Sequence, residues 1–304
     1  MIVNQNRTIV TLDQLRIFVA VAERDHLTRA AAALAMTPSA ISSAIRLLEE
    51  RYGTVLFNRV GRGIELSEAG RIFLPEARLA LASARAAELT LAELGQGRRG
   101  SLSLQASQTI ASYWLPAMLV KFHQAYPDVD IQLEVGNSQS VARAVAGGAA
   151  EIGFVEDRNH LPDLVSRAIA QDQFAVVVAP GHPWADGNAV APQALLEGTW
   201  IMREQGSGTR SAFEVMLADL GVHAADLRIA LVLPSNESVR SAVVAGPFAS
   251  VASTLVVAAD LAAGLLCKVN IGLPARAFHL LHHATRHRSK VSIAFEEMLL
   301  QTMA

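Results

Sequence analysis

The chain has 304 residues, of which 51% are hydrophobic and 18% charged, and its formal net charge at pH 7 is −2. This composition predicts a folded globular protein with more than one domain and excludes a disordered tail. The single cysteine, Cys267, excludes a disulfide within a monomer and a zinc site built on cysteine ligands. The first 100 residues carry 13 arginines and 10 acidic residues, so this end of the chain is slightly basic.

The chain opens without a basic segment followed by an apolar run, so we expect no signal peptide. The charge-free span 241–259 has the length of a membrane helix, but Gly246 and Pro247 interrupt it. We therefore expect this span to form a helix end, a turn, a buried strand and the start of another helix. The expected protein is soluble and cytoplasmic, and no membrane is among its partners.

The first predicted element is an amphipathic helix at residues 12–24, and two short helices follow within residues 27–50. Thr28 is the expected cap of the first short helix. Thr37 is the expected cap of the second, where Pro38 takes the first helical position because that position needs no N–H donor.

The second short helix is predicted to have two different sides. Its apolar side consists of Ile41, Ile45 and Leu48, with Ala44 beside them. Its polar side consists of Ser39, Ser42, Ser43 and Arg46. A short helix that presents hydroxyl groups and a guanidinium suits the major groove of DNA. From these residues alone, a plain helical hairpin with a solvated polar face is the alternative.

A loop rich in arginine and glycine lies between Phe57 and Leu66 and predicts a two-stranded wing. Arg59 and Arg62 at its tip are within reach of phosphates or the minor groove. Many surface hairpins carry two arginines, so this feature is informative only beside the helix pair.

Residues 68–94 show one long helical pattern. Apolar and small residues recur at alternating spacings of four and three, at Phe73, Ala77, Ala80, Ala84, Ala87, Leu91 and Leu94. Such a seam favours pairing with the same helix of a second copy, and a dimer matches a DNA site made of two half-sites. Packing of this seam onto its own domain is the alternative.

The stretch 95–100, rich in glycine and arginine, predicts a domain boundary. Beyond it strands and helices alternate, which predicts an α/β half with mainly parallel sheets. The predicted strands cover residues 101–106, 130–135, 152–155, 173–179, 200–203, 228–232, 250–253 and 276–283. The predicted helices cover residues 115–126, 138–146, 211–220, 236–245 and 292–303.

This order of elements resembles the LysR-type transcriptional regulators over nearly the whole chain. The resemblance is carried by two stretches, FVAVAERDHLTRAAAALAMTPSAISSAIRLLEERYGTVLFNR and IELSEAGRIFLP. It implies a winged helix-turn-helix DNA-binding domain at 11–68, a dimerising linker helix at 69–95 and an effector-binding domain at 101–304.

The resemblance also implies that the effector-binding domain has a two-lobed α/β fold like that of periplasmic binding proteins. Lobe one covers 101–170 and 272–304, and lobe two covers 171–271. A small effector between the lobes is expected to modulate promoter binding or DNA bending, which requires that it binds one arrangement better than another. The chain is expected to form a homodimer or homotetramer, to bind double-stranded DNA and to need no cofactor.

The residues expected to contact DNA lie on the helix pair and the wing. They are Thr28, Arg29, Thr37, Pro38, Ser39, Ser42, Ser43, Arg46, Arg59 and Arg62. The family often has Gln, Arg or Lys where this chain has Ser43 and Ala44. Alanine cannot hydrogen-bond a base edge, so we expect DNA reading here to rely on Arg46, the wing and DNA shape.

Two stretches are expected to face the effector cleft. Residues 107–109 follow a strand, where hydroxyl and N–H groups can bind an anion. Residues 203–210 contain two glycines that let backbone N–H groups turn inward as in an anion-binding nest. The candidate effector-binding residues are Ser107, Gln108, Thr109, Asn137, Gly206, Ser207, Gly208, Thr209 and Asn236. From the residues alone, the second stretch can also be an ordinary loop that caps a helix.

The run Gly206 to Arg210 resembles family members that sense sulfur compounds or regulate carbon fixation, which implies a small anionic effector. Asn137 and Glu156 end strands of lobe one and are candidates to line the cleft, with a role in an exposed loop as the alternative for both. Gln205 and Phe248 depart from the pattern of those relatives, and Phe248 is a candidate to narrow the cleft. The identity of the effector therefore does not carry over.

No catalytic constellation is evident. Ser207 has no local base, and its loop lacks the lysine of a phosphate-binding loop in nucleotide hydrolases. His279 and His283 share a face of a predicted strand, but acidic ligands are missing beside them, so we predict no metal site. We predict a transcriptional regulator and not an enzyme. A solute-binding protein of transport is the alternative, which would need a signal peptide or lipid anchor and no winged head.

Overall fold

The computed structural model describes residues 10–60, 63–94, 100–156 and 161–303. By its internal contacts the chain divides into two units, residues 1–94 with 147–149, and residues 95–146 with 150–304. Each unit has a hydrophobic core of its own.

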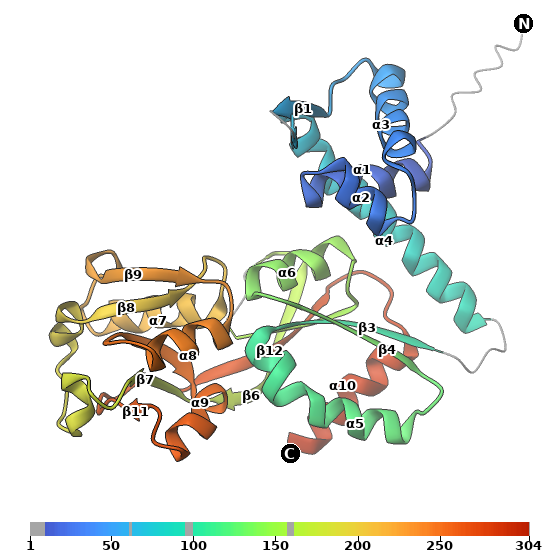
Figure 1. Cartoon of the computed structure of the whole chain (residues 1–304). Helices are drawn as coiled ribbons and strands as arrows, with labels where there is room; N and C mark the ends of the chain where they lie inside the picture. The colour runs from blue at the N-terminus through green and yellow to red at the C-terminus, as the bar shows by residue number, and fades with distance from the viewer. Residues whose placement is uncertain (1–9, 61–62, 95–99, 157–160, 304) are drawn as a thin grey trace, which may run out of the picture. The chain divides into compact units, whose positions relative to one another are not determined.

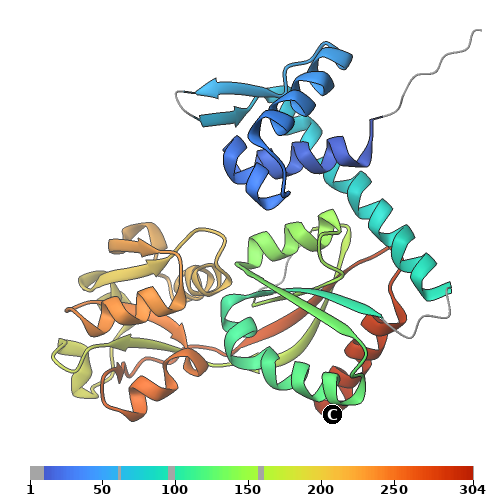
Figure 2. The ribbon, with the colours of Figure 1, turned by 45° about the vertical axis from the view of Figure 1, so that its right-hand side comes forward.

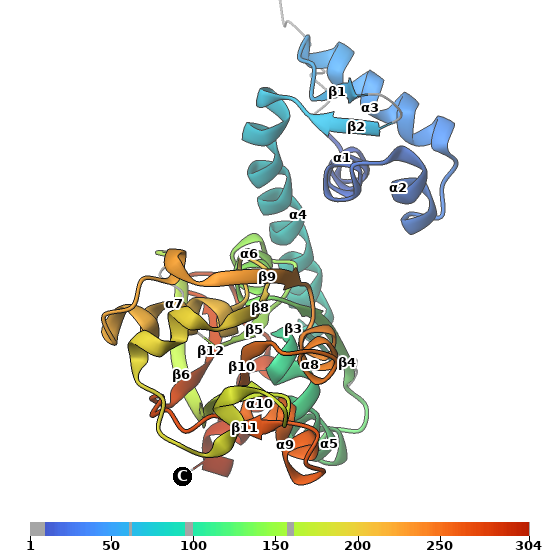
Figure 3. The same cartoon turned by 60° about the vertical axis from the view of Figure 1, so that its left-hand side comes forward.

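The first unit contains the predicted helix, helix pair, wing and long helix in that order (Figure 1). Its elements are α1 (Leu12–Arg24), α2 (Leu27–Ala33), α3 (Pro38–Tyr52), β1 (Phe57–Val60), β2 (Gly63–Leu66) and α4 (Glu68–Leu94). The two strands pair antiparallel, with Phe57 opposite Leu66. Figure 3 shows α4 as one continuous helix that follows β2.

The core of this unit is centred on Phe18, which is fully buried. Its ring centroid lies 5.3 Å from that of Phe57 and 4.9 Å from that of Phe73. The same cluster holds Ile41, Ile45 and Leu48, so the predicted apolar side of α3 is confirmed. Helices α1, α2, α3 and α4 and the wing are therefore held together by one set of apolar contacts.

The path from α3 into α4 is fixed by two close contacts. The Oε1 atom of Glu49 accepts hydrogen bonds from the N–H groups of Leu56 at 2.7 Å and Phe57 at 3.1 Å. Gly70 lies so close to Leu56 that a Cβ at this position would be 2.2 Å from the Leu56 carbonyl oxygen. A larger residue at position 70 would displace the start of the wing from α4.

The predicted cap of α2 is wrong, whereas that of α3 is confirmed. His26 is the N-cap of α2, and its Nδ1 accepts a hydrogen bond from the Thr28 N–H at 3.2 Å, so Thr28 lies within the first turn. The capping acceptor is therefore an imidazole nitrogen and not the hydroxyl group that was predicted. In α3, the Thr37 Oγ1 accepts from the Ala40 N–H at 3.2 Å.

The second unit contains two five-stranded sheets, which define its two lobes (Figure 2). The sheet of lobe one has the order β4 (Asp130–Gly136), β3 (Ser101–Ser107), β5 (Ile152–Val155), β12 (Arg276–His283) and β6 (Leu164–Asp172). The sheet of lobe two has the order β11 (Cys267–Lys268), β7 (Phe174–Val178), β10 (Ala249–Ser253), β8 (Thr199–Arg203) and β9 (Arg228–Leu233).

Helices cover these sheets. They are α5 (Leu115–Ala125), α6 (Ser138–Gly147), α7 (Gly208–Asp219), α8 (Asn236–Val244), α9 (Thr254–Ala262) and α10 (Lys290–Met303). A π-helical turn, η1 (Ile110–Trp114), precedes α5, and shorter 3-10 turns are η2 (Pro183–Asp186), η3 (Pro192–Glu197) and η4 (Ala224–Asp226). Each lobe has an aromatic centre, Phe122 with Phe295 in lobe one and Trp200 with Phe213 in lobe two.

All strands and helices predicted for this half are present, with ends shifted by a few residues. The prediction of mainly parallel sheets is wrong, because β12 runs antiparallel to both β5 and β6, and β7 runs antiparallel to β10 and β11. The strand β6 was not predicted, since its apolar residues are interrupted by Ser166, Arg167 and Gln171.

The charge-free span 241–259 runs from α8 through β10 into α9, as predicted. In the part of the chain that the structure describes, no single helix has the length and apolar character of a membrane span; α2 and α3 reach them only jointly, across a bend of 107°.

The predicted seam of α4 divides into two parts. Phe73 and Ala77 pack into the core of their own unit, which was the alternative to pairing. Further along the helix, the seam residues Ala80, Ala87 and Leu91 are exposed, the last of them to 69%. The side chain of Leu94 lies outside the described residues. The later part of α4 therefore carries uncovered apolar side chains.

The position of Phe18 makes the stability of the first unit sensitive to its loss. We expect Phe18→Ala to lower the free energy of unfolding of this unit by about 3–5 kcal/mol, because a fully buried ring leaves a cavity. Amide hydrogen exchange of the full chain, read in peptides from α1 and α3, measures this change. Ile72→Ala, at a 70% exposed position, is the control and should stay within about 0.5 kcal/mol of the original chain.

The second unit should lose stability in acid through His182, the N-cap of η2, whose Nδ1 accepts from the Trp184 N–H at 3.1 Å. Burial lowers the pKa of His182 in the folded chain. The unfolded chain therefore takes up this proton first, and stability falls as the pH drops from about 6.5 toward the lowered pKa. We expect the thermal midpoint of His182→Asn, which keeps an acceptor that does not titrate, to depend less on pH over this range. An unchanged pH dependence would contradict this role.

Candidate functional site

The polar side of α3 faces solvent. Ser39, Ser43 and Arg46 are exposed, and Ser42 is partly buried. The side chain of Arg46 is 69% exposed, and its Nε lies 3.7 Å from Oε1 of Glu50. An exposed pair of this kind contributes little free energy, so it does not withhold the guanidinium from a partner.

The other candidate DNA-contacting residues of this unit are also exposed. They are Thr28, Arg29, Thr37, Pro38 and Arg59, the last of them on β1, while Arg62 lies outside the described residues. Ala44 is partly buried against the core, so α3 does not offer it to a partner as freely as its serines. The helix, its cap and the strand of the wing thus present hydroxyl groups and guanidinium groups to solvent, which are donors suited to phosphates and base edges.

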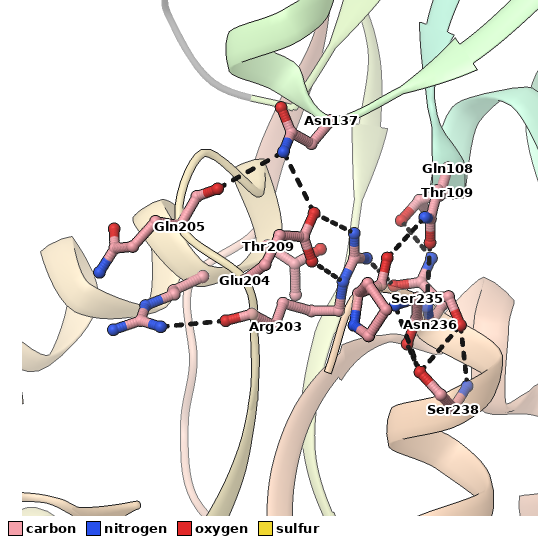
Figure 4. Close-up of polar contacts among 12 residues, drawn as sticks. Gln108, Thr109, Asn137, Arg203, Glu204, Gln205, Thr209, Ser235, Asn236 and Ser238 are labelled. Atoms are coloured by element: carbon pink, nitrogen blue, oxygen red, sulfur yellow. Dashed lines mark hydrogen bonds and ion pairs between the residues drawn. The ribbon is translucent and has the colours of Figure 1, made fainter. Parts of the chain in front are cut away.

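In the second unit, Asn236 joins the two lobes (Figure 4). It stands at the start of α8 in lobe two. Its backbone N–H donates to Oε1 of Gln108 at 3.0 Å, and its Nδ2 donates to Oγ1 of Thr109 at 3.1 Å. Gln108 in turn donates from Nε2 to the carbonyl oxygen of Pro234 at 2.9 Å. Three of the candidate effector-binding residues therefore contact one another across the lobes.

A second bridge between the lobes involves Asn137, which follows β4. Its Nδ2 donates to Oε1 of Glu204 at 3.2 Å and to the carbonyl oxygen of Gln205 at 3.4 Å (Figure 4). The N–H of Gln139 also donates to the carbonyl oxygen of Gly206 at 3.1 Å. The loop of residues 204–206 is thereby held against the start of α6.

Both bridges rest on Arg203, whose side chain is 4% exposed. Its Nε and Nη2 donate to the two carboxylate oxygens of Glu204 at 2.8 and 2.9 Å, and its Nη1 donates to Oδ1 of Asn236. Burial by itself raises the pKa of Glu204, but the hydrogen bonds and charge of Arg203 and the hydrogen bond of Asn137 together hold that pKa below its ordinary value. Glu204 is therefore a stable carboxylate that orients the guanidinium.

Residues 206–209 form the entry into α7. Gly206 has a φ of +85°, a conformation that side chains disfavour, and α7 begins at Gly208, three residues before the predicted start. Ser207 is the N-cap, but its side chain makes no capping hydrogen bond. The first N–H groups of a helix have no acceptor within the helix, so this turn is open to an acceptor from outside.

A buried arginine that the sequence did not reveal lies against this turn. Arg276, at the start of β12, donates from Nη1 to Oγ1 of Thr209 at 3.3 Å and from Nε to Oδ2 of Asp172 at 2.7 Å. Its guanidinium carbon lies 4.2 Å from the centroid of the Phe174 ring. The side chain is 4% exposed, and its Nη2 has no hydrogen-bond partner. This nitrogen is a buried donor that lacks an acceptor.

Ser107 provides a second buried group of this kind. Its residue is 2% exposed, and its Oγ has no hydrogen-bond partner. It ends β3, and the register from β3 through β5 to β12 places it level with His279, three residues along β12 from Arg276. Both unpartnered groups thus belong to the edge of the lobe-one sheet at which β3 and β5 end and β12 begins. Buried donors without acceptors are rare and call for a ligand or a water.

The candidate residues have two roles. Gln108, Thr109, Asn137, Gly206 and Asn236 bridge the lobes, whereas Ser207, Gly208 and Thr209 form the open turn of α7 beside Arg276. Ser107 ends β3 at the edge of the lobe-one sheet to which Arg276 belongs. Phe248 packs against the apolar cluster of lobe two that contains Val239 and Val243. One sequence signal could have indicated the pair of Arg276 and Asp172. Asp172 ends β6 and Arg276 begins β12, so each is a charge at the strand end where the chain crosses between the lobes.

The arrangement is suited to binding an anion. Its donors are a guanidinium, hydroxyl groups and the N–H groups of a helix N-terminus. In the described ranges, no group of three or more His, Cys, Asp or Glu residues is placed to hold a metal ion. His279 and His283, considered above as metal ligands, instead hydrogen-bond to Ser166 and Thr285 respectively.

Comparison with known proteins agrees with both halves of this description. The model of the bacterial regulatory helix-turn-helix proteins of the LysR family matches residues 12–71, and the model of the LysR substrate binding domain matches residues 95–304. The chain is 35% identical to the HTH-type transcriptional regulator YeiE of Escherichia coli K12 over 282 residues, which cover 92% of this chain and 94% of that protein.

A RuBisCO operon transcriptional regulator of Allochromatium vinosum is 31% identical over 297 residues, with 97% of each chain covered. The regulatory domain of Synechocystis PCC6803 CcmR, solved in complex with 2-PG, matches with a TM-score of 0.61 and 26% identity, over 67% of this chain and 97% of that one. The exposed recognition helix, the two lobes and these matches lead to one conclusion. The chain belongs to the LysR family and is a transcriptional regulator with a helix-turn-helix DNA-binding head and an effector-binding domain.

Proposed function

We propose that the effector of this regulator is a small anion that binds between the two lobes, at the first turn of α7. The observation that carries this proposal is the pair of buried groups without partners, Nη2 of Arg276 and Oγ of Ser107, at one edge of the lobe-one sheet. A guanidinium and a helix N-terminus favour negative charge, and a buried site makes their hydrogen bonds to an anion strong. Thr209, bonded to Arg276, belongs to the same site.

The remaining candidate residues are proposed to set the arrangement of the lobes. Asn236 and Asn137 hold lobe two against Gln108, Thr109 and the start of α6. An anion that binds this arrangement more tightly than another shifts the population toward it by its difference in affinity. This shift is the proposed signal to the DNA-binding head.

On this proposal the chain works as residues 11–68 for DNA binding, 69–95 for dimerisation and 101–304 for effector binding, with lobe one at 101–170 and 272–304 and lobe two at 171–271. The exposed seam residues of α4, Ala80, Ala87 and Leu91, support pairing of this helix in a homodimer or homotetramer. We infer that the protein acts in the cytoplasm, where a transcription factor meets its DNA, and that it is not an enzyme. A transport protein, the alternative, has no use for the winged head.

The proposed chemistry agrees with what the relatives are said to bind or control. The Allochromatium protein is described as a regulator of a RuBisCO operon, and the Synechocystis domain was solved with 2-phosphoglycolate, a small anion. Neither name fixes the effector of this chain, because identity to them is 31% and 26%. 2-Phosphoglycolate is therefore a probe of the site.

The DNA-binding role makes a direct prediction for the polar side of α3. We expect Arg46→Ala to weaken binding to a fragment of the chain's own promoter region by about 10- to 100-fold, because one base or phosphate contact is lost. Binding of the original chain should also weaken steeply as salt is raised. Gel-shift titration or fluorescence anisotropy measures both effects.

Lys121→Ala is the matched control for this prediction. Lys121 is an exposed cation on α5, within the second unit, so its loss changes the net charge equally. The DNA affinity of Lys121→Ala should stay within about twofold of that of the original chain, since a surface substitution away from the interface changes the binding free energy little. If the original chain shifted no fragment of its promoter region at low salt, the DNA-binding account would be wrong.

The effector role makes a prediction for Thr209. Replacing it with Val removes the oxygen that accepts from Nη1 of Arg276 and leaves a second guanidinium nitrogen without a protein acceptor. We expect Thr209→Val to weaken binding of 2-phosphoglycolate by about tenfold or more in calorimetry, as a hydroxyl donor and the position of Arg276 are lost.

Thr302→Val, on an exposed turn of α10, is the control for loss of a hydroxyl and should leave that affinity unchanged. Equal affinities of the Thr209 and Thr302 variants would remove Thr209 from the site.

A further inference from the structure

A buried carboxylate borders the first turn of α7. Glu156 follows β5 and is 4% exposed. The Oγ of Ser138 donates to its Oε2 at 2.7 Å. A Cβ built on Gly208 would lie 2.6 Å from this Oε2 and 2.4 Å from Oγ of Ser138. Glu156 therefore lies at the N-termini of both α6 and α7, in space that exists only because residue 208 is glycine.

Among the residues that the structure describes, no cation pairs with this carboxylate. No Lys, Arg or His in the described ranges lies within ion-pair distance of Glu156. Burying an unpaired carboxylate is unfavourable, and two helix N-termini offset that cost only in part. The fold has thus left room for a charged acceptor where an apolar side chain would be more stable.

The position of Glu156 ties it to the proposed effector site. Gly208 is the first residue of α7, and the next residue, Thr209, is bonded to Arg276. The first turn of this helix is therefore bordered by two kinds of group. Arg276 and the helix N–H groups can only donate hydrogen bonds, whereas an ionised Glu156 can only accept them.

We propose that Glu156 determines specificity, by selecting an effector whose anionic group keeps a proton or carries a hydroxyl beside it. This inference rests on the proposed effector site. A hydrogen phosphate, a monoprotonated phosphate ester or a hydroxycarboxylate offers oxygens to Arg276 and an O–H to Glu156. A fully deprotonated oxyanion such as sulfate offers no donor. Its oxygens are repelled by the Glu156 carboxylate, and the carboxylate is left without a hydrogen bond from the ligand.

Inorganic phosphate and sulfate are the probes that separate these cases. They are similar in size and shape, but near neutral pH phosphate keeps at least one proton and sulfate keeps none. Calorimetry on the full chain at matched ionic strength should show phosphate bound about 10- to 100-fold more tightly than sulfate, the ratio expected when one buried polar group is left unpaired.

Glu156→Gln tests the residue itself. The amide has nearly the shape of the carboxylate but supplies a donor, so sulfate should bind more tightly than before and the preference for phosphate should fall to about threefold or less. Glu134→Gln is the matched control, because it removes the same charge from an exposed position on β4 of the same lobe. Its preference should equal that of the original chain.

Three outcomes would overturn the proposal. They are equal affinity of the original chain for sulfate and phosphate, no binding of either anion at millimolar concentration, and an undiminished preference for phosphate in Glu156→Gln. Circular dichroism and the thermal midpoint of each variant establish that it is folded, and the comparison of the two anions on the original chain needs no variant. DNA affinity without added anion is measured on the same samples. Loss of DNA affinity in the original chain would contradict the DNA-binding function, but it would not bear on the selectivity of Glu156 between phosphate and sulfate.

Discussion

A buried ion pair lies where the chain crosses between the two lobes, and the proposed site depends on it. Asp172 ends β6 and Arg276 begins β12, so the pair joins both crossing strands, and Asp172 also accepts from Oγ of Ser253 in lobe two at 2.6 Å. A buried pair is favourable only when its remaining donors and acceptors are satisfied. Here one donor, Nη2 of Arg276, is left over, and Thr209 fixes the guanidinium beside α7. The ion pair between Asp172 and Arg276 thus joins the lobes and also leaves one guanidinium nitrogen available to an acceptor.

The same geometry explains how a ligand could act at a distance. The lobes touch directly through Asn236 and Asn137, so hydrogen bonds help to set their arrangement. Each such bond contributes modestly to stability because water competes for its partners. In the proposed function, an anion held by Arg276 and the first turn of α7 touches both lobes, and a difference in its affinity for two arrangements shifts the balance between them.

The features that sequence could predict are those set by nearby residues. The apolar and polar sides of α3 follow from helical periodicity, and its start follows from Thr37 and Pro38. The loop before α7 was predicted from its run of glycine and hydroxyl residues. The ion pair of Asp172 with Arg276 joins residues 104 positions apart. It depends on β6, a strand that could not be predicted because its apolar pattern is interrupted. The contact of Glu156 with Gly208 likewise needs two lobes to meet. The cap of α2 was assigned to Thr28 and not to His26 because an imidazole is not a usual capping group.

In the proposed function, an anion completes the hydrogen bonding of Arg276 and thereby links the effector-binding domain to the DNA-binding domain. A crystal structure of the full chain grown with phosphate tests this most directly. The account predicts electron density for the anion within hydrogen-bond distance of Nη2 of Arg276 and Oγ of Ser107, at the first turn of α7. Density only at other sites, with Nη2 of Arg276 bonded instead to a protein oxygen, would contradict it.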